Sequence, residues 1–310
     1  MDSSEGYLPL AVPLQSGMSS QQFQIGLVRF VPKSDSSKIL IGEPVDPDVD
    51  VGLAVYQGKE VAVKTFSGTS IVNYGQRTEA LEVIDRVLSP LTRDEVGTIR
   101  CIGLNYVNHA NEVKMALPTV PPVFLKPATS LADPWPAPSI LPKITQADNT
   151  GDYEAEMVIV IGRDAKNVSE ADALQYVLGY TAANDISSRT SQFAQSQWCF
   201  SKGFDTSCPI GPVVVSPSLV PDPSKLHIRG LKNNQVLQDS SLDDLIFTVP
   251  QLISFLTQGT TLPAGTIILT GTPGGVGVAR NPKEYLKAGD EFAVALLPHV
   301  GTLITKFENE

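Results

Sequence analysis

Two glutamates in the stretch GDYEAEMVIVIG have the type and spacing of a metal-binding pair. Glu154 and Glu156 stand two residues apart at the start of an apolar run that is typical of a buried strand. Side chains two apart in a strand point to the same face, so both carboxylates are expected to project together. Two neighbouring carboxylates repel each other, and a divalent cation that prefers oxygen ligands, such as Mg²⁺, Mn²⁺ or Ca²⁺, would neutralise them.

A third carboxylate is available in GYTAANDISSRTSQ, where Asp185 follows a strand of small residues. Strand ends of this kind often carry functional side chains, so Asp185 is a candidate third ligand. The spacing also allows another interpretation, in which the glutamates lie on an exposed strand edge and Asp185 caps a helix. Both remain open from these residues alone.

A possible acid/base pair occurs in CIGLNYVNHANEV, where His109 and Glu112 are three positions apart. In a helical turn this spacing puts both side chains on one face, where the carboxylate can orient the imidazole and raise its basicity. The alternative is an incidental pair on a solvated surface helix. The other histidines, His227 and His299, lie among strand-like residues without an acidic neighbour and are expected to be structural.

Two further segments have the composition of ligand-binding loops. Lys202 stands in the turn SKGFDTSCPIGP, and TIILTGTPGGVGV ends an apolar strand in a glycine-rich loop. That loop lacks the spacing of a phosphate-binding loop, so nucleotide binding is not indicated. A close approach to a ligand and a tight turn between strands are both compatible with it.

The composition narrows the choice of partner. The chain has 310 residues, 42% of them hydrophobic, which suffices for one large domain with a small appendage. A formal net charge of −10, without a Lys/Arg stripe, argues against nucleic acid. No apolar run is long enough to span a bilayer, so we expect a small-molecule substrate and no membrane partner.

The cysteines and the N-terminal segment bear on the compartment. Cys101, Cys199 and Cys208 are an odd set without CxxC spacing, which suits a reducing environment. The first 28 residues contain no Lys or Arg, which is atypical of secretory and mitochondrial signals. We therefore expect a cytoplasmic protein.

The pattern of apolar residues predicts an α+β, mostly β fold. Short β-rich runs recur between Gly, Pro and Asp turns, without regular βαβ alternation. We expect a flexible tail over residues 1–22, a small β-rich N-terminal domain over 23–92 and a catalytic domain over 97–310. Residues 51–63 look strand-like, and helices are expected over 77–88, 169–180 and 244–258.

Seven segments, taken in order, resemble the fumarylacetoacetate hydrolase family. The resemblance runs from about Cys101 to the C-terminus and implies a mixed β-sandwich roll as the catalytic domain. It also implies a homodimer, an Mg²⁺ or Mn²⁺ site, and a 2-oxo or β-dicarbonyl acid as substrate. The segments are NYVNHANE, FLKP, DYEAEMVIVIGR, GYTAANDISSRTSQ, KGFDTSCPIGP, LTGTPGGVGV and LKAGDEF.

The resemblance also implies roles for individual residues. Glu154, Glu156 and Asp185 correspond to the metal ligands, and His109 and Glu112 to a catalytic dyad on a mobile lid helix. Lys202 corresponds to a group that stabilises an enolate oxygen. The segments imply four further residues that contact the substrate: Lys126, Arg189, Gln192 and Thr272.

Several positions differ from the motifs that are common in the family, and these differences affect which substrate is expected. Leu104 stands where many members have Arg, Thr190 replaces Asp, Asn233 to Gln235 read NNQ instead of NGE, and Ser201 replaces Gly. The wording is closest to short eukaryotic members with oxaloacetate decarboxylase or tautomerase activity. Acylpyruvate C–C hydrolysis, a decarboxylase or hydrolase of a larger β-keto acid in specialised metabolism, and a catalytically silent metal-binding scaffold are the other hypotheses.

Overall fold

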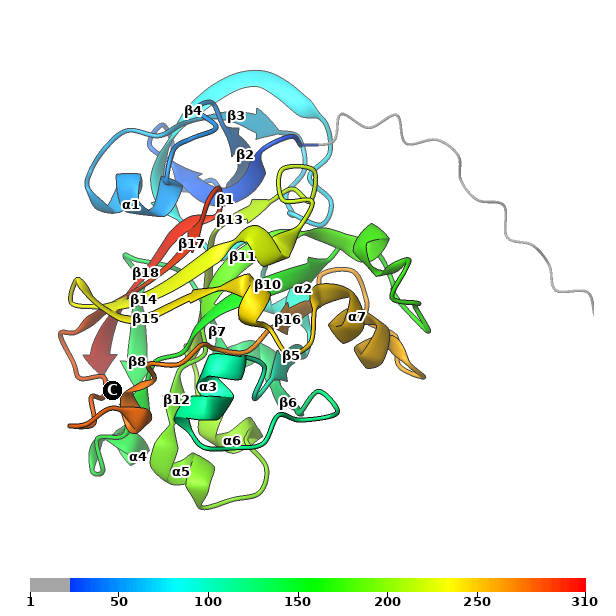
Figure 1. Cartoon of the computed structure of the whole chain (residues 1–310). Helices are drawn as coiled ribbons and strands as arrows, with labels where there is room; N and C mark the ends of the chain where they lie inside the picture. Colours follow the sequence, from blue (N-terminus) through cyan, green and yellow to red (C-terminus); the bar gives the residue numbers. More distant parts are fainter. Residues whose placement is uncertain (1–22) are drawn as a thin grey trace, which may run out of the picture.

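The computed structural model describes residues 23–310, so the expected flexible tail over residues 1–22 lies outside the described residues. Strands dominate, and two β-sheets form the centre of the molecule (Figure 1). The expected α+β, mostly β fold is confirmed. The α-helices of the described part are short: α1 (Val51–Tyr56), α2 (Arg93–Val96), α3 (Val107–Glu112), α4 (Lys143–Gln146), α5 (Arg189–Phe193), α6 (Cys199–Lys202) and α7 (Val249–Thr257).

The larger sheet contains eleven strands and is mostly antiparallel. In spatial order they are β2 (Leu40–Pro44), β3 (Ala62–Phe66), β4 (Arg77–Val87), β1 (Gly26–Pro32), β13 (Cys208–Val215), β11 (Val177–Asn184), β10 (Ala155–Ile161), β16 (Ile267–Leu269), β5 (Ile99–Ile102) and β6 (Val123–Lys126), with β7 (Leu131–Ala132) paired to β13.

A second sheet of five strands supplies the other half of the core. A short two-stranded ladder and five 3₁₀ helices complete the regular structure of the described chain. The second sheet is ordered β15 (Gln235–Ser241), β14 (His227–Lys232), β17 (Glu291–Leu297), β18 (Gly301–Asn309) and β8 (Pro138–Leu141); β9 (Gly151–Asp152) pairs with β12 (Ser187–Ser188); the 3₁₀ helices are η1 (Ala128–Ser130), η2 (Ala173–Tyr176), η3 (Pro223–Lys225), η4 (Leu242–Asp244) and η5 (Gly277–Ala279).

Strand β10 is buried on both faces because it lies between two hydrophobic clusters. Met157 and Ile159 pack into the cluster shared with the second sheet, whereas Val158 and Val160 pack into the cluster on the opposite face. This explains its unbroken apolar sequence, since a strand covered on both faces needs no polar alternation. Glu156 has the parity of Val158, so its side chain lies on the face away from the second sheet.

The N-terminal strands form a closed ring, because β1 pairs with both β2 and β4 while β3 joins β2 to β4.

Two predictions for this ring are wrong. The helix expected over 77–88 is a strand, because residues 77–87 form β4, and pairing with two strands overrides the helical spacing. The strand-like interpretation of 51–56 is also wrong, since Asp50 caps helix α1 there. Strand β1 also pairs with β13, and the domain boundary near residue 92 stays a prediction.

Of the other two expected helices, the one over 244–258 is present and the one over 169–180 is mostly absent. Helix α7 lies within the expected range 244–258 and begins at a capping box formed by Thr248 and Gln251. Over 169–180 only η2 is helical, and the chain enters β11 at Val177. Strand β11 fills the sheet position between β10 and β13, so tertiary pairing decides its conformation.

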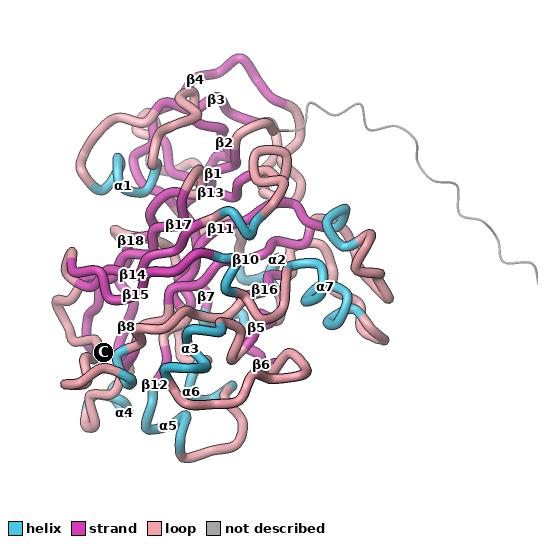
Figure 2. The backbone as a smooth tube through the Cα atoms, in the orientation of Figure 1, coloured by secondary structure: helices cyan, strands magenta, loops and turns pink. Residues whose placement is uncertain are grey.

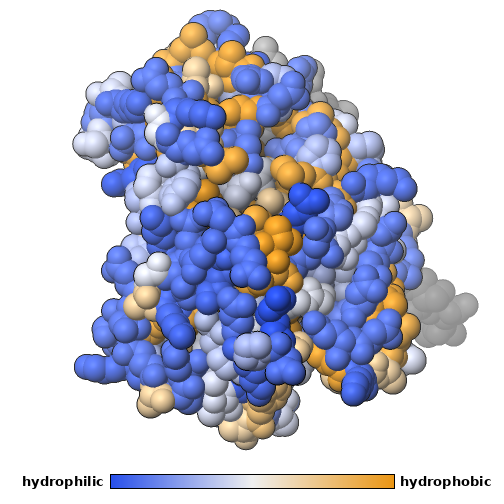
Figure 3. Space-filling view, turned by 60° about the vertical axis from the view of Figure 1, so that its left-hand side comes forward, coloured by the Kyte–Doolittle hydropathy of each residue, from blue (hydrophilic) through white to orange (hydrophobic). Residues whose placement is uncertain are grey.

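Helices α3, α5 and α6 gather at the end of the molecule opposite the N-terminal ring (Figure 1), and Figure 2 shows the loop that leads from α3 to β6 at this end. Hydrophilic residues dominate the face drawn in Figure 3, with a smaller apolar region near its middle. Within residues 23–310 no helix combines the length and hydropathy required to cross a membrane.

Candidate active site

The register between β10 and β11 brings three carboxylates together. Ala155 lies opposite Asn184, so Glu154 and Asp185 face each other one residue further along, and the amide of Asp185 donates to the carbonyl of Glu154 (2.9 Å). Opposed residues of an antiparallel pair share a face, and Glu156 follows on that face. One oxygen from each of the three carboxylates lies within 4.8 Å of the others, and all three side chains are buried.

Lys202 bridges two of these carboxylates. Its Nζ donates to Glu154 Oε2 at 2.8 Å, to Asp185 Oδ2 at 2.7 Å and to the hydroxyl of Ser187 at 2.7 Å. All three donor positions of the ammonium group are therefore used, which is the condition for burying a lysine. The carboxylates raise the pKa of Lys202 although burial lowers it, so the side chain carries its charge.

Two more buried cations lie beside the same cluster. Lys126 Nζ, from β6, donates to Asp185 Oδ1 (2.5 Å) and to the carbonyl of Ser207 (2.8 Å). Arg189, from α5, binds Asp152 Oδ2 through Nε and Glu154 Oε1 through Nη1, both at 2.7 Å. Both were expected to contact the substrate, yet their charged groups are engaged by the protein itself.

The pKa of Glu154 shows how strongly these cations act. Burial by itself raises the pKa of this carboxyl, but the charges of Lys202 and Arg189 outweigh burial and lower it to about 2. A smaller contribution in the same direction comes from His109. Glu154 is therefore ionised.

The charge environment of Glu156 differs from that of Glu154. Its Oε2 accepts from the amide of Gly271 at 2.7 Å, but within residues 23–310 it forms no ion pair with a basic side chain. Burial, together with the charges of Asp185 and Glu154, raises the pKa of Glu156 well above its ordinary value. Glu156 is the carboxyl that most lacks a positive partner.

The buried charges fit a divalent cation. With all four carboxyl groups ionised, the site has one more negative than positive charge, and the donor set is oxygen only. The carboxyl groups are Asp152, Glu154, Glu156 and Asp185, and the basic groups are Lys126, Arg189 and Lys202. Buried charges need partners, and an all-oxygen donor set matches Mg²⁺, Mn²⁺ or Ca²⁺. Three residues would hold the ion: Glu154, Glu156 and Asp185.

Helix α3 carries the expected acid/base pair. His109 Nδ1 lies 3.0 Å from Glu112 Oε2, and Glu112 Oε1 accepts from the amide of Gly275 at 2.9 Å. Burial raises the pKa of Glu112, but the hydrogen bonds from His109 and Gly275 outweigh burial and lower it. Gly275 must be glycine here: its φ is +105°, and a Cβ would lie 2.0 Å from the carbonyl oxygen of Leu237.

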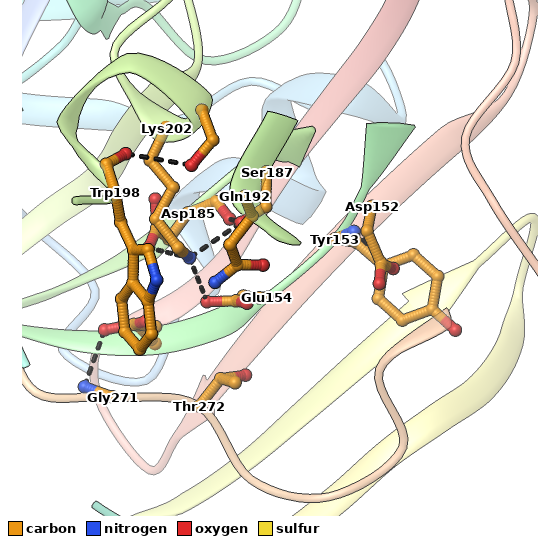
Figure 4. Close-up of polar contacts among 12 residues, drawn as sticks. Asp152, Tyr153, Glu154, Asp185, Ser187, Gln192, Trp198, Lys202, Gly271 and Thr272 are labelled. Carbon is orange, nitrogen blue, oxygen red and sulfur yellow. Dashed lines mark hydrogen bonds and ion pairs between the residues drawn. The ribbon is translucent and has the colours of Figure 1, made fainter. Parts of the chain in front are cut away.

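The remaining expected residues frame the same centre. The Oε1 atom of Gln192 accepts from Arg189 Nη1 at 2.8 Å. The hydroxyl of Thr272 donates to the carbonyl of Ala155 (3.0 Å), which ties the glycine-rich loop to β10 between the two glutamates. Figure 4 shows Gln192 near Lys202 and Glu154, with Thr272 on the neighbouring loop.

Sequence reasoning missed two buried polar residues. Asp152 accepts from the amides of Gly277 and Val278 as well as from Arg189, so it fixes the end of the glycine-rich loop. Its place in the GDYEAE segment beside the two glutamates was the available signal. Gln238 donates to Thr272 Oγ1 (2.7 Å) and accepts from the amide of Ala155 (2.9 Å), and no signal marked it.

Trp198 lies within the site, whereas His227 lies outside it. Trp198 lies beside Lys202 in Figure 4, and its ring occupies the space above Gly103, where an added Cβ would come within 2.5 Å of the indole. His227 was expected to lack an acidic partner, and this is wrong, because β14–β15 pairing brings it into contact with Asp239. The His227 pair is exposed and stands apart from the carboxylate cluster.

The chain is similar to known enzymes over most of its length. The family model described as fumarylacetoacetate (FAA) hydrolase C-terminal matches residues 98–308. A caffeoylpyruvate hydrolase of Neonothopanus nambi is 46% identical over 288 residues, which cover 92% of this chain and 93% of that protein. A mitochondrial oxaloacetate tautomerase of Xenopus laevis is 41% identical over 206 residues, covering 66% of this chain and 63% of that protein.

A solved structure agrees with these sequence matches. The 5-carboxymethyl-2-hydroxymuconate delta-isomerase of Mycobacterium smegmatis superposes with a TM-score of 0.75 at 28% identity, covering 92% of this chain and all of that one. The match includes the N-terminal ring as well as the two central sheets.

Proposed function

The chain belongs to the fumarylacetoacetate hydrolase family, and from this premise we propose that it is a divalent-metal-dependent hydrolase that cleaves the C–C bond of an acylpyruvate. The observation that carries the proposal is that one glycine-rich loop joins the His109–Glu112 pair to the three buried carboxylates, because Gly275 binds Glu112 and Gly271 binds Glu156. The caffeoylpyruvate hydrolase of Neonothopanus nambi supports it, because that similarity covers 92% of the chain, whereas the tautomerase match covers 66%.

We assign the metal to Glu154, Glu156 and Asp185, with Mg²⁺ or Mn²⁺ as the ion and Ca²⁺ as a further fit to the oxygen donors. An ion held by these residues would supply Lewis-acid polarisation of the substrate's 2-oxo group, which would make that group a better electron sink. A bound divalent cation would bring the net charge of the buried site residues from −1 to +1, which favours an anionic 2-oxo acid as the substrate.

The acid/base steps belong to the residues of the chain. His109 takes a proton from water as the water oxygen bonds to the acyl carbonyl carbon, and Glu112 orients the imidazole. The C–C bond then breaks and its electron pair moves onto the pyruvate fragment as an enolate. The positive charge of Lys202, whose donors are held by Glu154, Asp185 and Ser187, stabilises the enolate through its electrostatic field, without a direct hydrogen bond. The proton that His109 took from water then passes to the enolate carbon, which gives pyruvate beside the carboxylic acid.

Keto–enol exchange of oxaloacetate is the second candidate. The same His109–Glu112 pair can move a proton between carbon and oxygen without an attacking water, and the Xenopus laevis tautomerase is 41% identical over 206 residues. Decarboxylation of oxaloacetate is the third reaction compatible with an enolate-stabilising site, since it requires no base.

Two broader alternatives from the sequence remain. A larger β-keto acid in specialised metabolism fits the altered SSRT and NNQ segments. A silent metal-binding scaffold is disfavoured, because metal binding by the three carboxylates does not require the His109–Glu112 pair that the chain retains.

We further propose a homodimer, a cytoplasmic location and a supporting role for the N-terminal domain over residues 23–92. The mitochondrial tautomerase makes a mitochondrial location the alternative.

The test is a product analysis with three substrates: an aromatic acylpyruvate, a small aliphatic acylpyruvate and oxaloacetate. Each is incubated with the purified protein and Mn²⁺, and pyruvate, the released acid, CO₂ and enol content are measured separately. Hydrolysis predicts equal amounts of pyruvate and acid without CO₂. Enol–keto exchange without product release assigns the tautomerase reaction instead.

A further inference from the structure

We propose that Asp244 is a positioning residue that holds the N-terminal end of helix α3, and with it His109, against the carboxylate cluster. The inference rests on the proposed function, because it assigns His109 the role of general base. Asp244 ends the 3₁₀ helix η4, more than 130 positions along the chain from His109, and no feature of its sequence segment singles it out.

The contact is a hydrogen bond from the first turn of α3. The backbone amide of Asn108 donates to Asp244 Oδ2 at 3.0 Å. Asn108 immediately precedes His109, so this bond fixes the backbone from which the imidazole projects. Bonds from a backbone amide to a carboxylate are stronger than those between neutral groups.

Helix α3 needs an acceptor from outside because its own sequence provides none. The first amides of a helix have no partner within the helix, and a Ser, Thr, Asp or Asn normally accepts from them. Here the residue before the helix is Tyr106, which makes no capping hydrogen bond. Asp244 supplies the missing acceptor from a distant part of the chain.

The segment after Asp244 binds the chain that leads into α3. The amide of Ile246 donates to the carbonyl of Asn105 (2.8 Å), and the amide of Phe247 donates to Asn105 Oδ1 (2.7 Å). The Asn105 side chain in turn donates to the carbonyl of Thr270 (2.8 Å). Residues 244–247 therefore form a rigid support onto which the start of α3 is attached.

The two ends of the helix are held by different loops. Asp244 binds the first turn, and Gly275 of the glycine-rich loop binds Glu112 in the last turn. His109 lies between these attachments. Loss of the Asp244 contact leaves the helix held only by Gly275 at its last turn and by Asn105 before its first turn. The orientation of the His109 imidazole seen in the structure should then be less populated.

Asp243 provides a matched control. It is the same residue type at the adjacent position, it is exposed, and its side chain makes no hydrogen bond within the described residues. Asp244→Asn keeps an oxygen that can accept from Asn108, whereas Asp244→Ala removes it. Asp244→Glu moves the carboxylate by one methylene and serves as the second disruptive variant if the alanine variant does not fold.

The first readout is amide hydrogen exchange over residues 107–113 of the full chain, which does not depend on activity. Asp244→Ala should accelerate exchange in this segment about tenfold, as expected for loss of one charge-assisted hydrogen bond, and Asp244→Asn should restore most of the protection. Asp243→Ala should exchange like the parent protein. Equal exchange in the Asp243→Ala and Asp244→Ala proteins overturns the proposal.

The second readout separates this inference from the proposed function. With an acylpyruvate that the parent protein hydrolyses, Asp244→Ala should lower kcat/KM about tenfold, with Asp244→Asn close to the parent. If exchange changes as expected but no variant, including the parent, hydrolyses any acylpyruvate, the proposed function fails while the structural contact stands. If the parent is active and Asp244→Ala is equally active, the positioning role is refuted.

Discussion

His109 Nδ1 lies 3.0 Å from Glu112 Oε2, and the second oxygen of Glu112 accepts from the backbone of Gly275. The carboxylate is therefore fixed at both oxygens before it orients the imidazole. Because Nδ1 faces Glu112, the other ring nitrogen, Nε2, is left to exchange a proton with water or substrate. This arrangement gives a surface helix a His–Glu pair whose orientation depends on a loop from another part of the chain.

The first prediction concerns His109. Replacing it with alanine should reduce acylpyruvate hydrolysis by about 10²- to 10⁴-fold, the usual contribution of a positioned base. Tautomerisation should fall similarly, whereas decarboxylation needs no base and should fall less. Steady-state rates with each substrate test this, with the exposed His227→Ala variant as control. Unchanged rates in the His109→Ala protein, or a simultaneous loss of metal binding, would contradict the role.

The second prediction concerns pH and Glu112. Its pKa is lowered in the folded protein, so its contribution to stability is present above the unfolded pKa and is lost as pH falls through the folded one. The difference in unfolding free energy between the parent protein and Glu112→Gln should therefore shrink below about pH 4. Denaturant titrations at neutral and acidic pH measure it. A difference that stays constant across this range would refute the assignment.

The carboxylate cluster was predictable from local sequence because it depends on strand periodicity and on the pairing of two consecutive strands, β10 and β11. Glu154 and Glu156 needed only the two-residue repeat, and Asp185 became their neighbour through the shortest pairing available, β10 with β11. The surrounding basic groups could not be placed this way. Lys126, for example, reaches Asp185 from β6, three sheet positions away from β10, and only the tertiary fold joins them.

The errors have a common physical cause. Residues 77–87 show helical spacing, yet they close a ring with β1 and β3, and this pairing decides their conformation. Polar residues such as Gln238 were missed because their function is to satisfy buried backbone groups, a demand that appears only after the sheets pack.

The third prediction concerns Lys202. Replacing it with methionine leaves Glu154 and Asp185 with less positive charge, and breaking a buried ion pair costs about 3–5 kcal/mol. If the carboxylates bind a divalent cation, saturating Mn²⁺ should recover a large part of that loss. Lys232, a buried lysine paired with Asp290 at 3.1 Å, provides the matched control.

Thermal unfolding of both methionine variants with and without Mn²⁺ measures the effect. Mn²⁺ should raise the midpoint of Lys202→Met more than that of Lys232→Met. Equal responses of the two variants would show that the cation does not act at Glu154 and Asp185.

The fourth prediction concerns Gly275. An alanine there meets the carbonyl of Leu237 in addition to the strain of a positive φ, whereas Gly259 has a positive φ but no atom within 4 Å of an added Cβ. Gly259→Ala should cost about 1–2 kcal/mol of stability with activity retained. Gly275→Ala should cost more and should also lower hydrolysis, because the loop that holds Glu112 must shift. Similar activities of the two variants in kinetic assays would contradict this link.

The most direct measurement is pyruvate release from an aromatic acylpyruvate by protein stripped of divalent metal and then titrated with Mn²⁺, with bound metal counted in parallel. We expect no release from the stripped protein, full recovery at about one ion per chain, and weaker Mn²⁺ binding in the Glu156→Gln variant. Undiminished release from metal-free protein, or Mn²⁺ binding unaffected by Glu156→Gln, would contradict metal-dependent hydrolysis at the carboxylate cluster.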